Sequence, residues 1–229
     1  MSEIFAFADL HGRYDLWEKI KARVQPNDVL ISLGDCIDRG PQGLEIYKDL
    51  RARPHTYMIK GNHEDLAEKA IPILAKDNWY GREITLWFQN GGTETFKELE
   101  PLNKSEWYEL VQFFKTLPKE LMFLTEKGLI HCDHSGYTPN FQGCFEPYWD
   151  REHFNDDWRG LDREYMLHGH TPVQYLKKEL HMKLTEDFIH DPEIIVYNDG
   201  HKIDIDLGSI ISNKTALFNL NTFEVEYVK

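Results

Sequence analysis

Cysteine, positive charge and long apolar stretches are all scarce in this sequence of 229 residues. The three cysteines, Cys36, Cys132 and Cys144, form no CxxC pair and no even set, which argues against a disulfide framework. Lysine and arginine number 26 against 39 acidic residues, and the net charge of −13 would repel nucleic acids and anionic membranes. No apolar run approaches the roughly 18 residues of a membrane helix. We therefore expect a cytoplasmic protein that binds neither nucleic acid nor membrane.

The composition is that of an ordinary globular protein, with 41% hydrophobic and 28% charged residues. The N-terminus runs directly into a strand-like segment, without the basic and apolar stretches of a cleavable leader. Neither a repeat nor a linker interrupts the chain. We expect a single domain over residues 1–229, with a helical insertion at about 72–118.

Predicted strands and helices alternate in the first part of the chain, which indicates parallel strands joined by right-handed crossovers. Strands are expected at residues 4–8, 29–33 and 57–59, and helices at 15–24, 44–50 and from 65 onward. After Pro118 the pattern changes to strands at 122–124, 129–131, 165–167, 194–197, 203–207, 216–220 and 223–228. The sequence thus predicts an α/β fold.

Polar side chains follow five of the apolar strands. They are Asp9 with His11, Asp35, Asn62 with His63, His131, and His170. Open α/β sheets bind their ligands at the carboxyl ends of the strands, so these side chains are expected to meet at one edge. The mixture of imidazole, carboxylate and amide groups suits Mn, Fe or Zn better than Ca, which prefers oxygen ligands alone.

Asp35 lies in the stretch Gly34-Asp35-Cys36-Ile37-Asp38-Arg39-Gly40, directly after a buried strand. A carboxylate has two oxygens, so Asp35 could bridge two cations about 3.5–4 Å apart, an arrangement that serves phosphoester hydrolysis. Taken singly, His11 and His131 could be core histidines, Asn62 a turn residue and His170 a loop side chain. Their joint occurrence at strand ends favours the metal site.

Several motifs resemble those of the phosphoprotein phosphatase branch of the calcineurin-like metallophosphoesterases, above all its bacterial and phage-type enzymes. They are Asp9-Leu10-His11-Gly12, the Gly34–Gly40 stretch, Gly61-Asn62-His63-Glu64, the lone His131 and Gly169-His170-Thr171. The resemblance implies a sandwich of two mixed β-sheets flanked by helices. The segment Ile205-Asp206-Leu207-Gly208-Ser209 is similar to the part that closes the second sheet of this family.

The resemblance also implies a role for each motif residue. Asp9, His11 and Asp35 would hold the first of two divalent metal ions, and Asp35, Asn62, His131 and His170 the second, with Mn²⁺ preferred and Fe or Zn as alternatives. His63 would protonate the leaving group, oriented by Asp38, because a carboxylate keeps an imidazole protonated and correctly turned. Arg39 would grip the phosphate oxygens.

A second phosphate-binding arginine is expected from the resemblance in a Trp-x-Arg context, which Trp149-Asp150-Arg151 matches. Arg159 and Arg163 are the alternatives to Arg151. Two further histidines, His134 and His168, lie close to the motif positions and leave the choice of His131 and His170 open.

We therefore expect a hydrolase of phosphomonoesters in which a metal-bridging hydroxide attacks phosphorus directly. Its substrates would be proteins or peptides phosphorylated on serine or threonine, with dual specificity as an option, or small phosphoesters. A symmetric dinucleoside tetraphosphate hydrolase shares these motifs and is the alternative enzyme. A catalytically silent module that binds phosphate groups is the alternative outside the enzymes. The sequence does not predict an oligomeric state.

Overall fold

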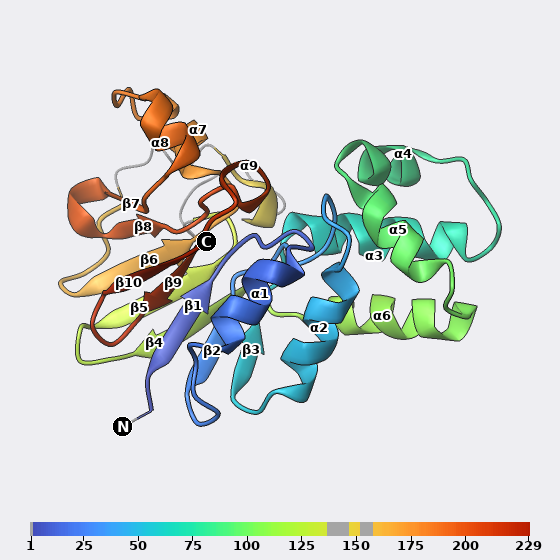
Figure 1. Cartoon of the computed structure of the whole chain (residues 1–229), viewed down its shortest axis with the longest axis horizontal. Coiled ribbons are helices and arrows are strands. Elements are labelled where there is room, and N and C mark those ends of the chain that lie inside the picture. The colour runs from blue at the N-terminus through green and yellow to red at the C-terminus, as the bar shows by residue number, and fades with distance from the viewer. Residues whose placement is uncertain (1, 137–146, 152–157) are drawn as a thin grey trace.

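The computed structural model describes residues 2–136, 147–151 and 158–229, and its strands form two mixed sheets (Figure 1). The first sheet has the order β10-β9-β1-β2-β3, in which β1, β2 and β3 run parallel. Its strands are β1 (Ile4–Phe7), β2 (Val29–Ser32), β3 (Thr56–Met58), β9 (Thr215–Asn219) and β10 (Val225–Val228). The expected parallel β-α-β order of the first part is thus confirmed, and the last two strands extend this sheet in antiparallel fashion.

The second sheet has the order β4-β5-β6-β8-β7, with β5, β6 and β8 parallel to one another. Its strands are β4 (Glu120–Leu124), β5 (Leu129–Asp133), β6 (Glu164–His168), β7 (Ile195–Tyr197) and β8 (Lys202–Asp204). Antiparallel pairing of β4 with β5 and of β7 with β8 adds one edge strand on each side. The fold expected from the sequence, two mixed sheets flanked by helices, is confirmed.

Helices cover the sheets. They are α1 (Tyr14–Lys21), α2 (Gly43–Ala52), α3 (Asn62–Leu74), α4 (Arg82–Gln89), α5 (Gly92–Leu99), α6 (Lys104–Thr116), α7 (Val173–Glu179), α8 (Glu186–His190) and α9 (Ser209–Ser212), with short 3₁₀ turns η1 (Pro147–Trp149) and η3 (Asn198–Gly200). Figure 1 shows α3 to α6 grouped on one side of the first sheet. Contacts between α3 and α4 and between α3 and α6 tie this group together. The single-domain organisation, with a helical insertion at about 72–118, stays a prediction.

Alternation along the strands separates two apolar cores. Phe7 and Leu30 point toward the helices and pack in a core with Trp17. Ala6 and Ile31 point the other way, into a second core that contains residues of the opposite sheet. Strands buried on both faces explain the continuous apolar runs in the sequence. Both cores leave the loops at the carboxyl ends of the parallel strands free to carry polar residues.

Several helices differ from the sequence prediction. Helix α3 begins at Asn62 instead of residue 65, because the Glu64 carboxylate accepts the backbone N–H of Gly61 at 2.8 Å and satisfies the first turn. Helices α7 and α8 had no counterpart among the predicted elements. The earlier start of α3 matters, because it makes Asn62 and His63 the first residues of a helix.

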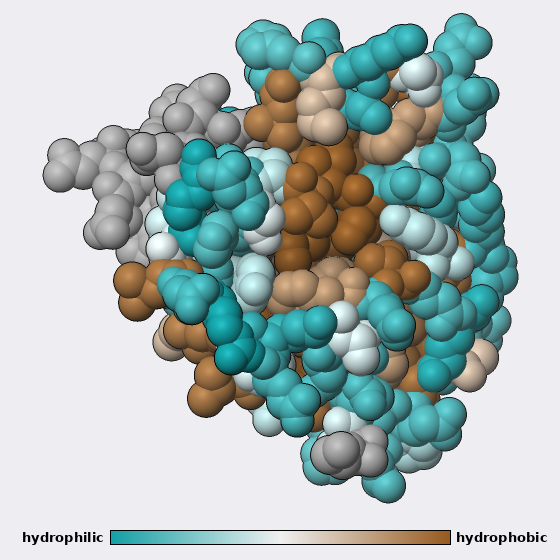
Figure 2. Space-filling view, turned by 90° about the vertical axis from the view of Figure 1, so that its left-hand side faces the viewer, coloured by the Kyte–Doolittle hydropathy of each residue, from teal (hydrophilic) through white to brown (hydrophobic). Residues whose placement is uncertain are grey.

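Much of the face seen in Figure 2 is hydrophilic. On the side of the molecule seen in Figure 2, apolar side chains gather in a central hollow that hydrophilic residues border. In the described part of the chain, no helix combines the length and the apolar character that crossing a membrane would require. Cys36 and Cys132 are buried free thiols, and Cys144 lies outside the described residues.

Candidate metal centre and active site

The loops after the parallel strands are hydrogen-bonded to one another. The backbone N–H of Asp9 donates to the carbonyl of Gly34, and that of His11 donates to the carbonyl of Asp35 at 3.0 Å. Asp9, His11 and Asp35 all have left-handed backbone conformations, with φ of 51°, 48° and 53°. Such conformations cost energy in residues other than glycine and concentrate at functional sites. The bonds between the two loops hold these side chains in place.

Asp35 lies at the centre of the cluster. Its Oδ2 atom is 3.9 Å from His11 Nε2, 3.8 Å from His63 Nε2 and 3.3 Å from His134 Nε2. Its Oδ1 atom accepts the backbone N–H of His63 at 3.0 Å. A Cβ atom on Gly61 would lie 2.0 Å from Oδ1, so only glycine leaves room for the carboxylate. This central position is the one expected for a residue that bridges two ions.

Asn62 gathers a second group of ligand atoms. Its Oδ1 atom lies 3.0 Å from His134 Nε2 and 2.8 Å from His170 Nδ1. The backbone N–H of His170 donates to Asp9 Oδ2 at 3.0 Å, which connects this group to the loop after β1. A Cβ atom on Gly169 would lie 2.1 Å from the same oxygen. Residues from four separate parts of the chain thus converge on one small volume.

His131 does not join this cluster, and the choice of His131 as a ligand is corrected to His134. The ring of His131 lies between two carboxylates, with Nδ1 2.6 Å from Glu120 and Nε2 2.8 Å from Glu164. Strand β5 continues to Asp133, so the first residue beyond its end is His134. The Nδ1 atom of His134 donates to the carbonyl of Leu33 at 2.7 Å, which aims Nε2 at Asp35.

His168, the other additional histidine, is buried beside the neighbouring strands. Its Nε2 atom lies 2.8 Å from the hydroxyl of Tyr197 on β7. Burial lowers the pKa of His168 to about 3, so the ring is neutral at physiological pH. His170, and not His168, is therefore the histidine of this loop that reaches the cluster.

Two acidic residues support the cluster and were not among the predicted site residues. Glu64 accepts the backbone N–H groups of Asp35 and Cys36 at 2.9 and 3.2 Å and thereby fixes the turn after β2. Asp206 is buried, accepts the backbone N–H of Gly208, and lies close enough to Asp9 to perturb its ionisation. The Gly-Asn-His-Glu motif contained a signal for Glu64, but the segment around Asp206 indicated only a strand and a turn.

His63 and Asp38 form a fully buried pair. The Nδ1 atom of His63 lies 2.7 Å from Asp38 Oδ2, and neither side chain is exposed to solvent. A carboxylate only accepts, so Nδ1 carries the proton and Nε2 points toward Asp35. The pair was expected from the sequence, and the structure brings the two residues together.

Arg39 and Arg151 contact different members of the cluster. The guanidinium of Arg39 lies 2.7 Å from His11 Nε2 and 2.9 Å from His63 Nε2. Arg151 donates from Nε to His170 Nε2 at 3.2 Å. The two alternatives to Arg151 are bound elsewhere, Arg159 to Asp199 and Arg163 to the carbonyl of Lys127. Of the three candidate arginines, Arg151 is the one that reaches the site.

Electrostatic interactions in the cluster favour a bound cation. Burial, followed by the negative charge of Asp206, raises the pKa of Asp9 well above its usual range. Burial also opposes ionisation of Asp35, but the imidazoles of His134 and His63 outweigh it and hold the pKa of this carboxyl low. Asp35 in turn outweighs the effect of burial on His134 and raises its pKa to about 10. Protons on the carboxyl of Asp9 and on the ring of His134 compensate the negative charge of the buried carboxylates, and a metal ion would compensate the same charge.

The donor atoms fit divalent metal ions. His11, Asp35 and His63 form one compact group, and Asp35, His134 and His170 form another, with ligand atoms within 4.8 Å of one another in each. Asp9 and Asn62 add a carboxylate and an amide oxygen beside them. Imidazole and carboxylate oxygens without thiolates are typical of catalytic first-row metal sites. Both groups share Asp35, so each could hold an ion with this carboxylate in common.

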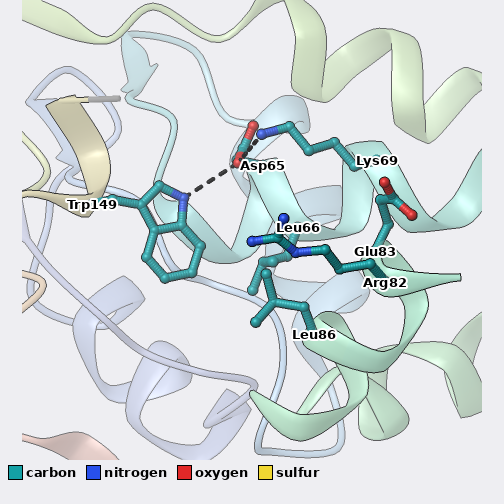
Figure 3. A pocket seen from close by; sticks show the side chains of 7 residues that line it. All are labelled: Asp65, Leu66, Lys69, Arg82, Glu83, Leu86 and Trp149. Carbon is teal, nitrogen blue, oxygen red and sulfur yellow. Dashed lines mark hydrogen bonds and ion pairs between the residues drawn. The ribbon is translucent and has the colours of Figure 1, made fainter. Parts of the chain in front are cut away.

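A hollow of about 230 Å³ lies between α3, α4 and Trp149 (Figure 3). Leu66 and Leu86 supply apolar surface, and the side chain of Arg82 reaches across it. The indole of Trp149 donates to Asp65 at 3.3 Å. Two residues of its lining are close in sequence to residues of the site, since Asp65 follows Asn62 by three positions and Trp149 precedes Arg151 by two.

Comparison with known proteins identifies a matching family. A family model described as calcineurin-like phosphoesterase matches residues 3–202. Serine/threonine-protein phosphatase 2 of Escherichia coli is 30% identical over 139 residues, which are 58% of this chain and 59% of that protein. Serine/threonine-protein phosphatase 1 of Salmonella typhimurium is 28% identical over 181 residues, covering 75% of this chain and 79% of that protein. The chain thus spans less than two thirds of the length of the first of these relatives.

One further relative and one solved structure extend the comparison. An asymmetrical bis(5′-nucleosyl)-tetraphosphatase of Bacillus subtilis is 24% identical over 205 residues, covering 75% of this chain and 80% of that protein. A metallophosphoesterase from Sphaerobacter thermophilus superposes with a TM-score of 0.56 at 17% identity, covering 99% of this chain and 87% of the other. The structural likeness concerns the fold.

Proposed function

Because the chain belongs to the calcineurin-like phosphoesterase family, a family of metal-dependent hydrolases, we propose that it hydrolyses phosphomonoesters with two divalent metal ions. The single observation that carries the proposal is the position of Asp35, whose Oδ2 atom lies 3.9 Å from His11 Nε2 on one side and 3.3 Å from His134 Nε2 on the other. Asp9, His11 and Asp35 would hold one ion, and Asp35, Asn62, His134 and His170 the other. Mn²⁺ suits these ligands, with Fe or Zn as alternatives. When bound, the ions supply a nucleophilic hydroxide and a clamp on the phosphate oxygens.

The residues of the chain would divide the remaining work. His63 donates the proton on Nε2 to the departing oxygen, and Asp38 keeps Nδ1 protonated and the ring in place. Arg39 and Arg151 each turn a guanidinium toward the cluster and would bind the equatorial phosphate oxygens with charge-assisted hydrogen bonds. Two such contacts orient the phosphate and offset the acidic net charge of −13 locally.

We propose proteins or peptides phosphorylated on serine or threonine as substrates, with dual specificity toward phosphotyrosine and activity on small phosphoesters as options. The relatives named serine/threonine-protein phosphatase support this choice. The size of the hollow between α3, α4 and Trp149 supports it too. At about 230 Å³ it falls below the range of about 300–1,000 Å³ that small-molecule pockets usually have, so it suits one side chain of an extended peptide.

Hydrolysis of a dinucleoside tetraphosphate is the second candidate, favoured by the relative in Bacillus subtilis. Trp79 and Tyr80 are 54% and 87% exposed and could stack on bases. Stacking contributes about 1–3 kcal/mol per base, but four phosphates would also need several cations. Lys69, one cation of the hollow, already pairs with Asp65 at 2.7 Å. The acidic chain therefore supports the dinucleotide less well than the phosphopeptide.

The substrate choice is tested by steady-state kinetics on one preparation loaded with Mn²⁺. The protein is offered a phosphothreonine peptide, 4-nitrophenyl phosphate and diadenosine tetraphosphate side by side. We expect a higher kcat/KM on the peptide than on the dinucleotide, loss of activity on chelation, and recovery that is best with Mn²⁺. A tenfold preference for the dinucleotide would replace the substrate class but leave the metal chemistry intact. Inactivity on all three would indicate a module that binds phosphate without turnover.

The proposed location is the cytoplasm, where free thiols such as those of Cys36 and Cys132 stay reduced. The acidic charge supports the proposal that neither nucleic acid nor membrane is a partner.

A further inference from the structure

The acid pair His63–Asp38 is surrounded by donors from the helices that follow α3. The carboxylate of Asp38 accepts the indole N–H of Trp87, with Nε1 3.1 Å from Oδ1 and 3.0 Å from Oδ2. The hydroxyl of Thr95 donates to Oδ1 at 2.6 Å and accepts the backbone N–H of Asp38 at 2.9 Å. Asp38, Trp87 and Thr95 are all completely buried. Trp87 belongs to α4 and Thr95 to α5, so both donors come from the helical insertion.

Backbone geometry shows that these contacts fix the motif loop. Asp38 and Arg39 have φ of 67° and 65°, conformations that few residues other than glycine adopt. They are held from outside the loop, Asp38 by Thr95, and Arg39 by an N–H bond to the carbonyl of Gly91 at 3.0 Å. A Cβ atom on Gly92 would lie 2.4 Å from Trp87 Nε1, so this glycine is what lets the indole reach the carboxylate.

We propose that Trp87 and Thr95 are positioning residues for the leaving-group acid, so that the helical insertion belongs to the catalytic machinery. The inference rests on the proposed function of His63. A buried carboxylate that accepts from both the Trp87 indole and the Thr95 hydroxyl is fixed in one orientation, and it therefore holds His63 Nδ1–H in one direction. Without the indole and the hydroxyl, the carboxylate can rotate, and Nε2 of His63 no longer points steadily at the departing oxygen.

The test compares variants that remove one hydrogen bond and keep the shape of the side chain. Trp87→Phe removes the N–H and retains an aromatic ring, and Thr95→Val removes the hydroxyl at nearly constant volume. Trp107→Phe is the matched control, because Trp107 is also buried in the helical group but donates to the carbonyl of Leu99 at 2.7 Å. Thr95→Ser keeps the hydroxyl and should restore what Thr95→Val loses.

Rates are measured on a phosphoserine peptide, with a basic leaving group, and on 4-nitrophenyl phosphate, with a good one. General acid catalysis contributes about 10²–10⁴-fold to the rate, mostly where the departing oxygen is basic. We therefore expect Trp87→Phe and Thr95→Val to slow hydrolysis of the peptide roughly 10- to 100-fold, and hydrolysis of the aryl ester less than about threefold. Metal content by elemental analysis should stay that of the wild type. Trp107→Phe should leave the ratio of the two rates unchanged. Equal losses on both substrates, or the same ratio change in Trp107→Phe, would overturn the proposal.

A double-mutant cycle separates positioning from general damage. In a His63→Asn background the acid is absent, so Trp87→Phe should cause no further loss on the peptide. Additive losses would contradict the proposal. A readout independent of turnover is the NMR signal of the His63 Nδ1 proton, which should shift in Trp87→Phe and stay in Trp107→Phe. If the wild type hydrolyses neither substrate, the proposed function fails, while the NMR signal still decides whether Trp87 and Thr95 set the geometry of the pair.

Discussion

His134 and Asn62 are 72 positions apart in the chain, yet His134 Nε2 lies 3.0 Å from Asn62 Oδ1. This contact assigns His134, instead of His131, to the second group of ligand atoms. We expect His134→Gln to lose one of the two metal ions and most activity, because it removes an imidazole that both Asp35 and Asn62 face. Elemental analysis of the reconstituted protein measures the loss. His131→Gln is the matched control and should keep both ions, and metal loss in that variant alone would reverse the assignment.

His131 should instead contribute to stability in a manner that depends on pH. Burial by itself would lower its pKa, but the hydrogen bonds to Glu120 and Glu164 outweigh burial and raise the pKa above 6.5. A raised pKa in the folded state means that the contribution is fully present below about pH 6.5 and disappears as the pH rises through the folded-state value. We expect His131→Gln to lower the free energy of unfolding by about 1 kcal/mol near pH 5.5, and by less at higher pH.

Denaturant unfolding of both proteins over a series of pH values measures this difference. His55→Gln serves as the control, since His55 is exposed and its side chain makes no hydrogen bond or ion pair that is recorded in the described part of the chain. A difference between wild type and His131→Gln that grows with rising pH would contradict the role of the two glutamates.

The error at His131 shows where sequence reasoning stops. Apolar alternation located β5, but the end of a strand is set by its hydrogen bonds to both neighbours, and β5 pairs with β4 as far as Asp133. The predicted strand ended at His131, whereas β5 ends two residues later at Asp133, so the first residue beyond the strand is His134. By contrast, Asp9, Asp35 and Asn62 each lie shortly beyond a parallel strand, where the sequence predicted them, because a glycine or a tight turn follows each of these short apolar runs.

The hydrogen-bond partners of Asp38 could not be predicted from the sequence either. Trp87 and Thr95 are 49 and 57 positions away from Asp38, on helices whose apolar spacing predicts only that they pack. Nothing in a helical pattern tells which buried tryptophan turns its N–H toward a carboxylate. The sequence showed Asn90-Gly91-Gly92-Thr93 as a break between helical segments. It did not show why position 92 is glycine, which is that a Cβ atom there would clash with the indole of Trp87.

Asp35→Asn and His63→Asn should fail in different ways. Asp35 faces both groups of ligand atoms, so the amide variant should lose most bound metal and all measurable turnover. His63→Asn should retain both ions and lose roughly 10²–10⁴-fold in rate on a phosphoserine peptide, with a much smaller loss on 4-nitrophenyl phosphate. Metal analysis and kinetics on the two substrates separate these outcomes. An empty site in His63→Asn would make His63 a ligand and not the acid.

Arg151 is expected to bind phosphate, and its geometry offers two matched controls. Its Nε atom donates to His170 Nε2, so the guanidinium is anchored beside the cluster without an ion pair to a carboxylate in the described residues. A charge-assisted hydrogen bond contributes about 1.5–3 kcal/mol, so Arg151→Ala should raise the inhibition constant of inorganic phosphate by about tenfold or more and slow turnover.

Arg159→Ala and Arg163→Ala should behave as wild type, because those side chains bind Asp199 and the carbonyl of Lys127. Arg151→Lys should recover little, since an ammonium cannot form the planar two-pronged contact. Phosphate inhibition that is unchanged in Arg151→Ala would leave Arg39 as the arginine that grips the substrate.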